Sequence, residues 1–461
     1  MNLPARLLQW LSLLVLVLLG PAPGIAAPPL LPPHPLSLSE AIALVRQRNP
    51  DLQAARTRIE RAAARLDEVT AAFLPHLQAG VRYTHSNDPA RAFGMIVSQR
   101  RFDFAMDINH PGYVEDFRPE IGASWSLFRG GRDWYARQAA KLGLEATRLA
   151  RAELDNRLAA ATSRAFYALL EAPQRIEVAD KTLKTVRKEL ELMRARFHEG
   201  TALKSDVLSL QVRLAQARED RIRAENARLA ARTALATLLA LPSDSDIPVR
   251  DESRRLPAGE GDFQHWLEQA LQRRPEWLAA RKQVAMRKQE LRAAWGEHLP
   301  RVDAFVVYGM NSPNPRFPTS RDNWTMGVKA QVDLFAGGAV AARVRQARQR
   351  LAEAERLEAS TRLRVEQEVR QAWLDLRDAL ARVEVARRSV AAAEEALKLV
   401  RAQYRGGTAT VTRFLEAETD AAGARLQWIS ARFGALVAEA ELKRATGLWR
   451  SQEVSDDQTN Q

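Results

Sequence analysis

Two long stretches of the chain place apolar residues at alternating spacings of three and four. The first contains Ile176, Ala179, Leu183, Val186, Leu190, Met193 and Phe197, and the second contains Val383, Ala386, Val390, Ala393, Leu397, Val400 and Tyr404. A repeat of about 3.5 residues is typical of a narrow coiled-coil seam. Arginine, lysine and glutamate occupy the other faces, so each stretch predicts a long helix that needs a partner along one seam only.

Each stretch ends in a loop motif that occurs twice, with a separation of 207 positions. Its shared positions are an aromatic residue, a glycine and a threonine, which are Phe197, Gly200 and Thr201 in the first copy and Tyr404, Gly407 and Thr408 in the second. Glycine readily adopts the left-handed conformation that ends many helices. Another amphipathic stretch follows each loop, so the pattern predicts two antiparallel helical hairpins with these residues at their tips.

Elsewhere the apolar period changes from helical to two. Apolar and polar residues alternate in four segments, which are His76–His85, Glu120–Phe128, Val302–Met310 and Asn323–Leu334. Each has about the ten residues that a tilted strand needs to cross a bilayer. A soluble, half-buried sheet would also alternate, but here charged residues interrupt the polar faces and aromatic residues lie near the strand ends.

Four strands cannot close a barrel, and an open sheet edge within lipid leaves backbone groups without hydrogen-bond partners. If these strands lie in a membrane, several chains must therefore combine their sheets. Three chains would give a barrel of twelve strands.

A pair of glycines follows the second strand of each hairpin, in Leu127-Phe-Arg-Gly130-Gly131 and in Leu334-Phe-Ala-Gly337-Gly338. A phosphate-binding loop is not indicated, because neither pair is followed by lysine and serine or threonine within a βαβ unit. We expect Gly130, Gly131, Gly337 and Gly338 to form flexible joints where a strand leads into a long helix.

The order of elements occurs twice and divides the chain into two similar halves. We place the first half at residues 28–240, a linker at 241–261 and the second half at 262–450. Each half begins with a short helix that a proline motif interrupts, Asn49-Pro50 in the first and Arg274-Pro275 in the second. The long helix of the first half contains Pro173, where we expect a kink.

The first 27 residues have the features of a secretory signal peptide. Arg6 precedes an apolar run from Leu7 to Leu19, and small residues follow up to Ala27. The run is shorter than the roughly 20 residues that a membrane-spanning helix needs. We therefore expect an exported chain without a transmembrane helix, ending in a disordered tail at 451–461.

The composition narrows the function classes further. The 461 residues include no cysteine, which in an exported protein favours long helices or oligomerisation over disulfides as the source of stability. The net charge is +13, but the arginines are spread along the helices and interleaved with acidic residues. We therefore expect no nucleic-acid partner.

We also expect no enzymatic activity, no metal site and no cofactor. Histidines are scattered without metal-ligand spacing, at His76, His85, His198, His265 and His298. Glu297-His298 lacks the second histidine of a zinc-binding helix. Acidic pairs such as Asp375 and Asp378 lie among arginines, which is typical of solvated ion pairs.

Taken together, these features resemble the TolC outer-membrane efflux factor family. The resemblance rests on Asn49-Pro50-Asp51-Leu52, on Leu-Phe-x-Gly-Gly before each long helix and on Phe/Tyr-x-x-Gly-Thr at each tip, and it extends from about Leu38 to Gly447. It implies a homotrimer in the lipid of the Gram-negative outer membrane, with a twelve-stranded β-barrel and a helical barrel through the periplasm. It also implies a passive duct for efflux or type I secretion that works with a periplasmic adaptor protein and an inner-membrane transporter.

The resemblance assigns two tasks to the tips: contact with the adaptor and closure of a periplasmic gate. TolC-like tips often bring aspartates from the return helix to a narrow lumen. Asp206 keeps this character, whereas Arg413 occupies the matching position of the second half, with Glu416 one turn later. Arg413 could pair with Asp206 across neighbouring hairpins and hold the gate closed, or it could pair with Glu416 or Glu418 on its own helix.

The first strand hairpin departs from the internal symmetry, because it is 18 residues longer than the second. The extra residues lie at roughly Ser86–Asp116, in a loop that the resemblance implies is extracellular. Two roles remain open from the sequence: the loop folds over the pore mouth, or it clasps a neighbouring protomer.

A soluble periplasmic coiled-coil scaffold or adaptor is the alternative function. An adaptor would carry one hairpin between small β-domains, whereas this chain has two hairpins and no such domains. The sequence leaves open the cargo and the particular pump.

Overall fold

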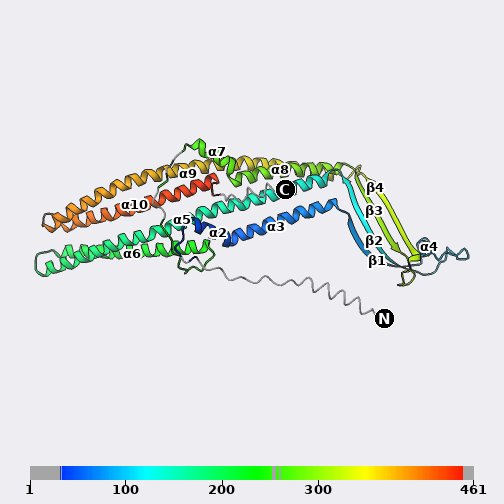
Figure 1. Cartoon of the computed structure of the whole chain (residues 1–461), viewed down its shortest axis with the longest axis horizontal. Coiled ribbons are helices and arrows are strands. Elements are labelled where there is room, and N and C mark those ends of the chain that lie inside the picture. The colour runs from blue at the N-terminus through cyan, green and yellow to red at the C-terminus, as the bar shows by residue number, and fades with distance from the viewer. Residues whose placement is uncertain (1–31, 33, 252–255, 258, 260, 450–461) are drawn as a thin grey trace.

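A computed structural model describes residues 32, 34–251, 256, 257, 259 and 261–449. The expected signal peptide and C-terminal tail lie outside the described residues. The chain is strongly elongated, with a β-sheet at one end and two helical hairpin tips at the other (Figure 1). The predicted combination of long helices with one small sheet is confirmed.

The same order of elements occurs in both halves. The first half consists of α2 (Leu38–Arg48), α3 (Pro50–Thr70), η1 (Ala71–Phe73), β1 (His76–Ser86), α4 (Pro89–Ser98), β2 (Val114–Arg129), α5 (Arg132–His198) and α6 (Lys204–Leu238). The second consists of α7 (Phe263–Arg273), α8 (Pro275–Trp295), η2 (Gly296–His298), β3 (Arg301–Met310), η3 (Thr319–Arg321), β4 (Asp322–Gln331), α9 (Ala339–Arg405) and α10 (Val411–Thr446). Between their two strands, the first half has an α-helix, α4, and the second half has only the short 3-10 helix η3.

The long helices α5 and α9 have 67 residues each. Pro173 lies inside α5, which continues through it without a break. Proline removes one hydrogen-bond donor from the helix, but buried residues on both sides of it, Ala172 and Val178, anchor the adjoining turns. A kink at Pro173 stays a prediction. Among the described residues, no helix is both long and apolar enough to cross a membrane.

The four strands form one antiparallel sheet in the order β1-β2-β3-β4. β2 begins at Val114, earlier than the predicted Glu120, because its first residues pair with the end of β1. β4 ends at Gln331, before the predicted Leu334, because its partner β3 begins at Arg301, directly opposite Gln331. Beyond that pair, no neighbouring strand remains to hold the chain in the sheet.

The predicted linker packs against the first half. Leu36 and Val249 form a parallel β-bridge, and the amide of Leu36 donates to the carbonyl of Pro248 at 2.8 Å. Ile247 is buried with Leu36 in a cluster that also includes Leu235 and Phe166. The described part of the linker, which showed little pattern of its own, therefore contributes to the core between α2, α5 and α6.

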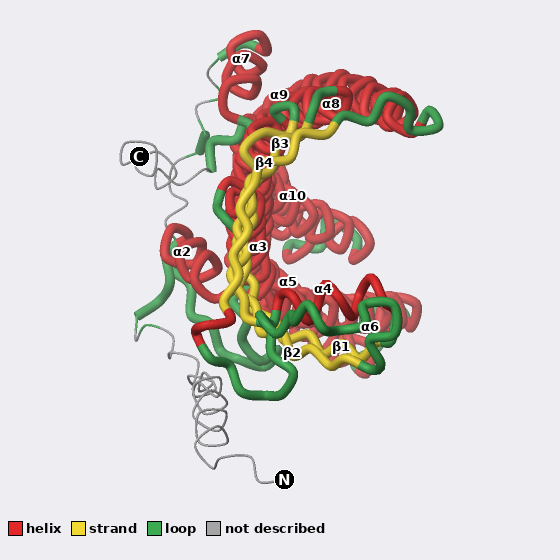
Figure 2. The backbone as a smooth tube through the Cα atoms, turned by 90° about the vertical axis from the view of Figure 1, so that its right-hand side faces the viewer, coloured by secondary structure: helices red, strands yellow, loops and turns green. Residues whose placement is uncertain are grey.

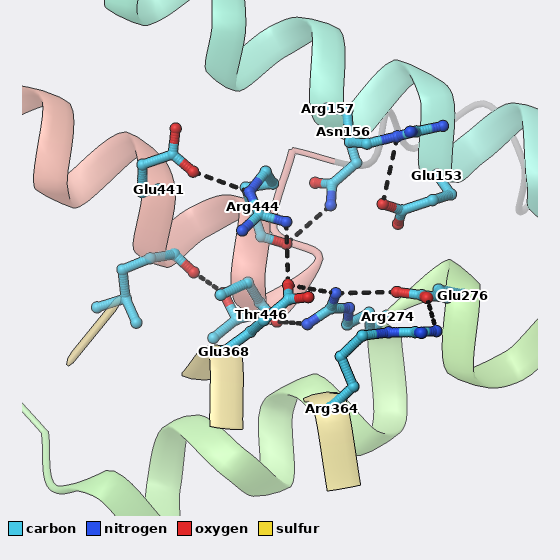
Figure 3. Close-up of polar contacts among 12 residues, drawn as sticks. Glu153, Asn156, Arg157, Arg274, Glu276, Arg364, Glu368, Glu441, Arg444 and Thr446 are labelled. Carbon is cyan, nitrogen blue, oxygen red and sulfur yellow. Dashed lines mark hydrogen bonds and ion pairs between the residues drawn. The ribbon is translucent and has the colours of Figure 1, made fainter. Parts of the chain in front are cut away.

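A network of partly buried ion pairs joins α9, α10 and the break between α7 and α8, and a hydrogen bond from Asn156 to the carbonyl of Arg444 links it to α5 (Figure 3). Arg274 is only 1% exposed. Its Nη2 lies 2.9 Å from Glu276 Oε2 and 2.7 Å from Glu368 Oε2. Arg444 Nη1 approaches the same Glu368 oxygen at 3.2 Å, and its Nε lies 2.8 Å from Glu441 Oε2. A buried charge is tolerated only when it is paired in this way.

The break between α7 and α8 has a close counterpart in the first half. The side chain of Asn49 accepts from the amide of Asp51 and donates to the carbonyl of Leu238, at 3.0 and 3.1 Å. Arg274 stands in the matching place and donates to the carbonyl of Ala445, at 3.4 Å. Asn49 therefore connects the break between α2 and α3 to the end of α6, and Arg274 connects the break between α7 and α8 to the end of α10.

Glu153 on α5 borders this ion-pair network. Burial raises the pKa of Glu153 and the nearby Glu276 carboxylate raises it further, while Arg274 and Arg157 oppose the shift. When the pKa of a carboxyl group is higher in the folded state than in the unfolded state, its contribution to stability is fully present only at a pH where both states are protonated. As the pH rises from the unfolded pKa through the folded one, this contribution is lost.

We predict that Glu153→Gln raises the melting temperature at pH 8 and leaves it nearly unchanged at pH 4. The amide removes the cost of ionising a buried carboxyl, and this cost exists only at the higher pH. Circular dichroism at 222 nm, recorded on detergent-solubilised protein, measures both transitions. Glu177→Gln on the exposed side of the same helix is the control and should change neither. A melting temperature lowered at pH 8 by Glu153→Gln would contradict the prediction.

Candidate functional site

The two hairpin tips share one backbone geometry. Gly200 and Gly407 have φ of 73° and 79°, as the sequence predicted for helix ends. After each glycine, a threonine amide donates to a carbonyl five residues back, from Thr201 to Arg196 at 2.8 Å and from Thr408 to Gln403 at 2.9 Å. The threonine hydroxyls donate to the same carbonyls. The repeated glycine and threonine therefore encode the same tight reversal twice.

The aromatic residues of the two tips lie in different surroundings, although they are equivalent in sequence. Tyr404 is 6% exposed and stacks on Phe414, with ring centroids 5.0 Å apart. Phe197 is 40% exposed. The cluster around Tyr404 is formed by residues of both hairpins, including Val186, Leu190, Met193, Val207, Leu210, Leu397, Val400, Val411 and Phe414. The two tips of one chain therefore pack together through the second tip's aromatic residue.

The predicted gate residues form one contact within the chain. Arg413 Nη1 lies 3.2 Å from Glu416 Oε2 on the same helix, and both side chains are more than half exposed. Asp206 lies in the first turn of α6 and is half-buried. Glu418 is buried and pairs instead with Arg401, at 3.2 Å. The single chain thus shows the second alternative for Arg413, and pairing across chains stays a prediction.

Glu418 and Phe414 hold the second tip together, a role that was not apparent from the sequence pattern. The stacking of Phe414 on Tyr404 and the ion pair between Glu418 and Arg401 both link α9 to α10. Val411, Phe414 and Glu418 follow one another at spacings of three and four, which places them on one face of a helix. This spacing was the signal that could have identified the two residues.

One face of the sheet is apolar and exposed along its length. The exposed fractions are 71% for Leu77, 72% for Val81, 60% for Ile121, 65% for Trp324, 65% for Met326 and 67% for Val328. The register brings Ala79 opposite Ile121 and Ala304 opposite Val328 on this face. Soluble monomers rarely expose so continuous an apolar surface, which marks a site of protein or membrane contact.

The opposite face of the sheet is polar and internally bonded. Ser126 donates to Asp303 at 2.6 Å, and Arg118 pairs with Glu120 at 3.0 Å. Each outer strand, β1 and β4, has one edge that pairs with no other strand in the described parts of the chain. The backbone N–H and C=O groups at these edges can pair with further strands placed alongside, and in lipid they need such partners.

The two glycine joints also differ in their surroundings. All four glycines have positive φ, between 60° and 82°. A Cβ on Gly130 would lie 2.0 Å from the carbonyl oxygen of Gly296, so close packing against η2 requires glycine there. A Cβ on Gly337 or Gly338 would meet nothing within 4 Å. The first joint is therefore packed against the second half of the chain, and the second joint is open.

The described residues contain no group of three or more histidine, cysteine, aspartate or glutamate side chains that could hold a metal ion. The tips and the sheet instead present tight turns, an apolar face and ion pairs.

Comparisons with known proteins agree with this architecture. The family model described as outer membrane efflux protein matches residues 41–241 and 266–448. The chain is 27% identical to protein CyaE of Bordetella pertussis over 70% of this chain and 67% of that protein. It is 26% identical to the outer membrane protein TolC of Vibrio cholerae, over 64% and 68% respectively. Some curated relatives align over as little as 40% of their own length.

Among solved structures, the outer membrane protein VceC of Vibrio cholerae superposes with a TM-score of 0.76. It shares 19% sequence identity over 89% of this chain and 96% of that one. The family match covers both halves of the chain and most of its length. The chain therefore belongs to the outer membrane efflux protein family, and it is a TolC-like protein of the Gram-negative outer membrane.

Proposed function

We propose that this chain is one protomer of a homotrimeric export channel with a twelve-stranded outer-membrane β-barrel. The observation that carries the proposal is the four-stranded sheet, which has one exposed apolar face and two unpaired edges. Three copies joined edge to edge would pair every strand, turn the apolar faces to lipid and enclose the polar faces as a lumen. The long helices would continue this lumen into the periplasm.

The channel acts as the passive outer duct of a tripartite efflux or type I secretion system. A periplasmic adaptor and an inner-membrane transporter deliver the substrate, and the duct supplies no chemistry of its own. This assignment is supported by the names of relatives, which include an alkaline protease secretion protein and outer membrane proteins of the TolC type. A soluble periplasmic scaffold is not favoured, because it would leave the apolar face of the sheet in water.

We predict that Met326→Arg prevents assembly in the outer membrane, whereas Thr325→Arg does not. These neighbours lie on opposite faces of β4, and an arginine facing the middle of the lipid costs about 2–4 kcal/mol. Native mass measurement of detergent extracts should show trimers for the parent and for Thr325→Arg. A stable monomer of the parent, or full recovery of the parent without detergent, would overturn the barrel proposal.

Tyr404 is buried between the two hairpins, so it supports the tips from within and does not contact a partner. The tips are proposed as the adaptor-docking surface, formed by Phe197, Gly200, Thr201, Gly407 and Thr408. They stand at the end of the molecule opposite the sheet (Figure 1). Phe197 is the exposed aromatic residue of the two tips, and both glycines have open space beside them. A partner helix can therefore approach the backbone of each turn closely.

We predict that Gly407→Lys abolishes export, while Gly407→Asn keeps most of it. Both replacements strain the left-handed turn, at a cost of roughly 1–2 kcal/mol for an L-residue and less for asparagine. Only lysine adds a long charged group to the docking surface. Export is measured in cells, with trimer content and surface exposure as controls for assembly. Normal export by trimers of both Gly407→Lys and Gly200→Lys would place docking elsewhere.

Asp206, Arg413 and Glu416 are proposed as the periplasmic gate. In a trimer, three arginines and their acidic neighbours would surround the narrow end of the lumen. An exposed ion pair contributes only about 0–1 kcal/mol, so the Arg413–Glu416 contact leaves Arg413 free to exchange its partner for Asp206 of a neighbouring hairpin.

We predict that Arg413→Asp raises single-channel conductance and cation selectivity in planar bilayers. The substitution removes pairing with Asp206 and adds an acid to each chain at the constriction. Glu416→Gln, which removes only the partner on the same helix, should change conductance less. If Arg413→Asp matches the parent in both properties, Arg413 does not line the gate.

A further inference from the structure

The long connection between β1 and β2 is fixed to the sheet by buried polar contacts. Gln99, which follows α4, has no exposed surface. Its Nε2 donates to Asp116 Oδ1 at 2.9 Å and to the carbonyl of Glu115 at 2.7 Å. Asn311 Nδ2 donates to the other oxygen of Asp116 at 2.7 Å. The connection is therefore bound to β2 and, through Asp116, to the end of β3.

The same contacts reach β4. Asn323 Nδ2 donates to Asn311 Oδ1 at 3.0 Å and to the carbonyl of Ser98 at 3.3 Å. Arg100 donates to the carbonyl of Asp322 at 3.0 Å, although its own backbone has a strained φ of 55°. A non-glycine residue in this conformation persists only where its surroundings hold it. The connection thus crosses from β1 over the outer ends of β2, β3 and β4.

The strand register shows which face of the sheet the connection covers. Glu120 lies opposite Gly309, and Gly309 lies opposite Asn323. Asp116 and Asn311 follow at even spacing along β2 and beyond β3, so they share the face of Glu120 and Asn323. This is the polar face. Figure 2 agrees, because α4 lies on the concave side of the curved sheet, whereas α2 and α7 lie beyond its convex side.

The connection also carries exposed aromatic residues. α4 buries Ala92, Met95 and Ile96 against Val114. Beyond this core, Phe93 and Phe102 lie edge to face, with centroids 5.5 Å apart, and Phe102 and Phe104 are 5.2 Å apart. Their exposed fractions are 38% for Phe93, 40% for Phe102 and 95% for Phe104. An apolar cluster attached to the polar face has no lipid to cover it.

We propose that the segment from Pro89 to Tyr113 folds into the outer mouth of the channel and that its aromatic cluster docks on the same segments of the other two protomers. The proposal rests on the proposed trimer, in which the polar faces surround one axis. A three-fold axis brings three copies of Phe104 toward one another and covers the apolar surface that a single chain leaves exposed. The result is an apolar constriction, which resists the passage of ions because water leaves narrow apolar pores readily.

This arrangement favours the first of the two roles that the sequence left open for the long loop, in which the loop folds over the pore mouth. A loop that clasped the outside of a neighbour would extend from the apolar side of the sheet or past its edge. The contacts of Gln99, Asp116 and Asn323 instead fix it over the polar face.

The natural absence of cysteine from the chain permits a direct test by disulfide crosslinking. Phe104→Cys places one thiol per protomer at the proposed meeting point, and Trp324→Cys places a thiol at another exposed position, on the apolar face of β4. After oxidation of purified trimers, we expect disulfide-linked dimers from Phe104→Cys and monomers from Trp324→Cys on non-reducing gels. Adding Gln99→Ala to Phe104→Cys should lower the dimer yield about two-fold or more, because the loop loses its buried anchor.

Crosslinking also has a consequence for transport. The ionic conductance of oxidised Phe104→Cys trimers in planar bilayers should fall below that of the parent, and a reductant should restore it. Trimers by native mass measurement that give no Phe104 dimer, or equal dimer yields from both cysteine variants, would overturn the constriction while leaving the channel proposal intact. Absence of trimers in the cysteine-free parent would instead count against the proposed function itself.

Discussion

Unsatisfied strand edges are the constraint on which the rest of this molecule depends. The sheet has four strands, and hydrogen-bonding groups along β1 and β4 face outward without partners in the described chain. In lipid, each such group costs several kcal/mol. A sheet of this kind is incomplete by itself, and its exposed apolar face makes water an equally poor environment. The helices, which bury only narrow seams, share this dependence on neighbouring chains.

The internal repeat shows the same incompleteness at the level of single residues. Tyr404 is covered by the other hairpin of its own chain, whereas the equivalent Phe197 is exposed. Gly130 is packed against Gly296, whereas the equivalent Gly337 has open space beside it. In each pair, one member packs against the other half of the chain. The other member is open in the single chain, where the proposed trimer leaves room for a second copy.

Much of the fold could be predicted from period and turn chemistry, because helices, strands and tips each leave a local signal. The start of β2 was missed because Val114–Pro119 contains two acids and a proline, which obscure the alternation. The anchoring of the long loop had no local signal, since Gln99 and Asn323 lie far apart in sequence and meet only through the register of the sheet. The different environments of Phe197 and Tyr404 had no local signal either, because the two motifs are equivalent and do not show which aromatic residue a neighbour covers.

The equal lengths of α5 and α9 restrict how the length of either helix can change. Each helix has 67 residues between its glycine joint and its tip, or roughly 100 Å at 1.5 Å per residue. Two helices of equal length bring both turns to the same level, so the proposed docking partner would meet two tips of equal height. Inserting one heptad into a single helix would displace its tip by about 10 Å while preserving the apolar seam. A change in the length of one long helix therefore requires a matching change in the other. The common length of the two helices then sets the distance that the proposed duct can span.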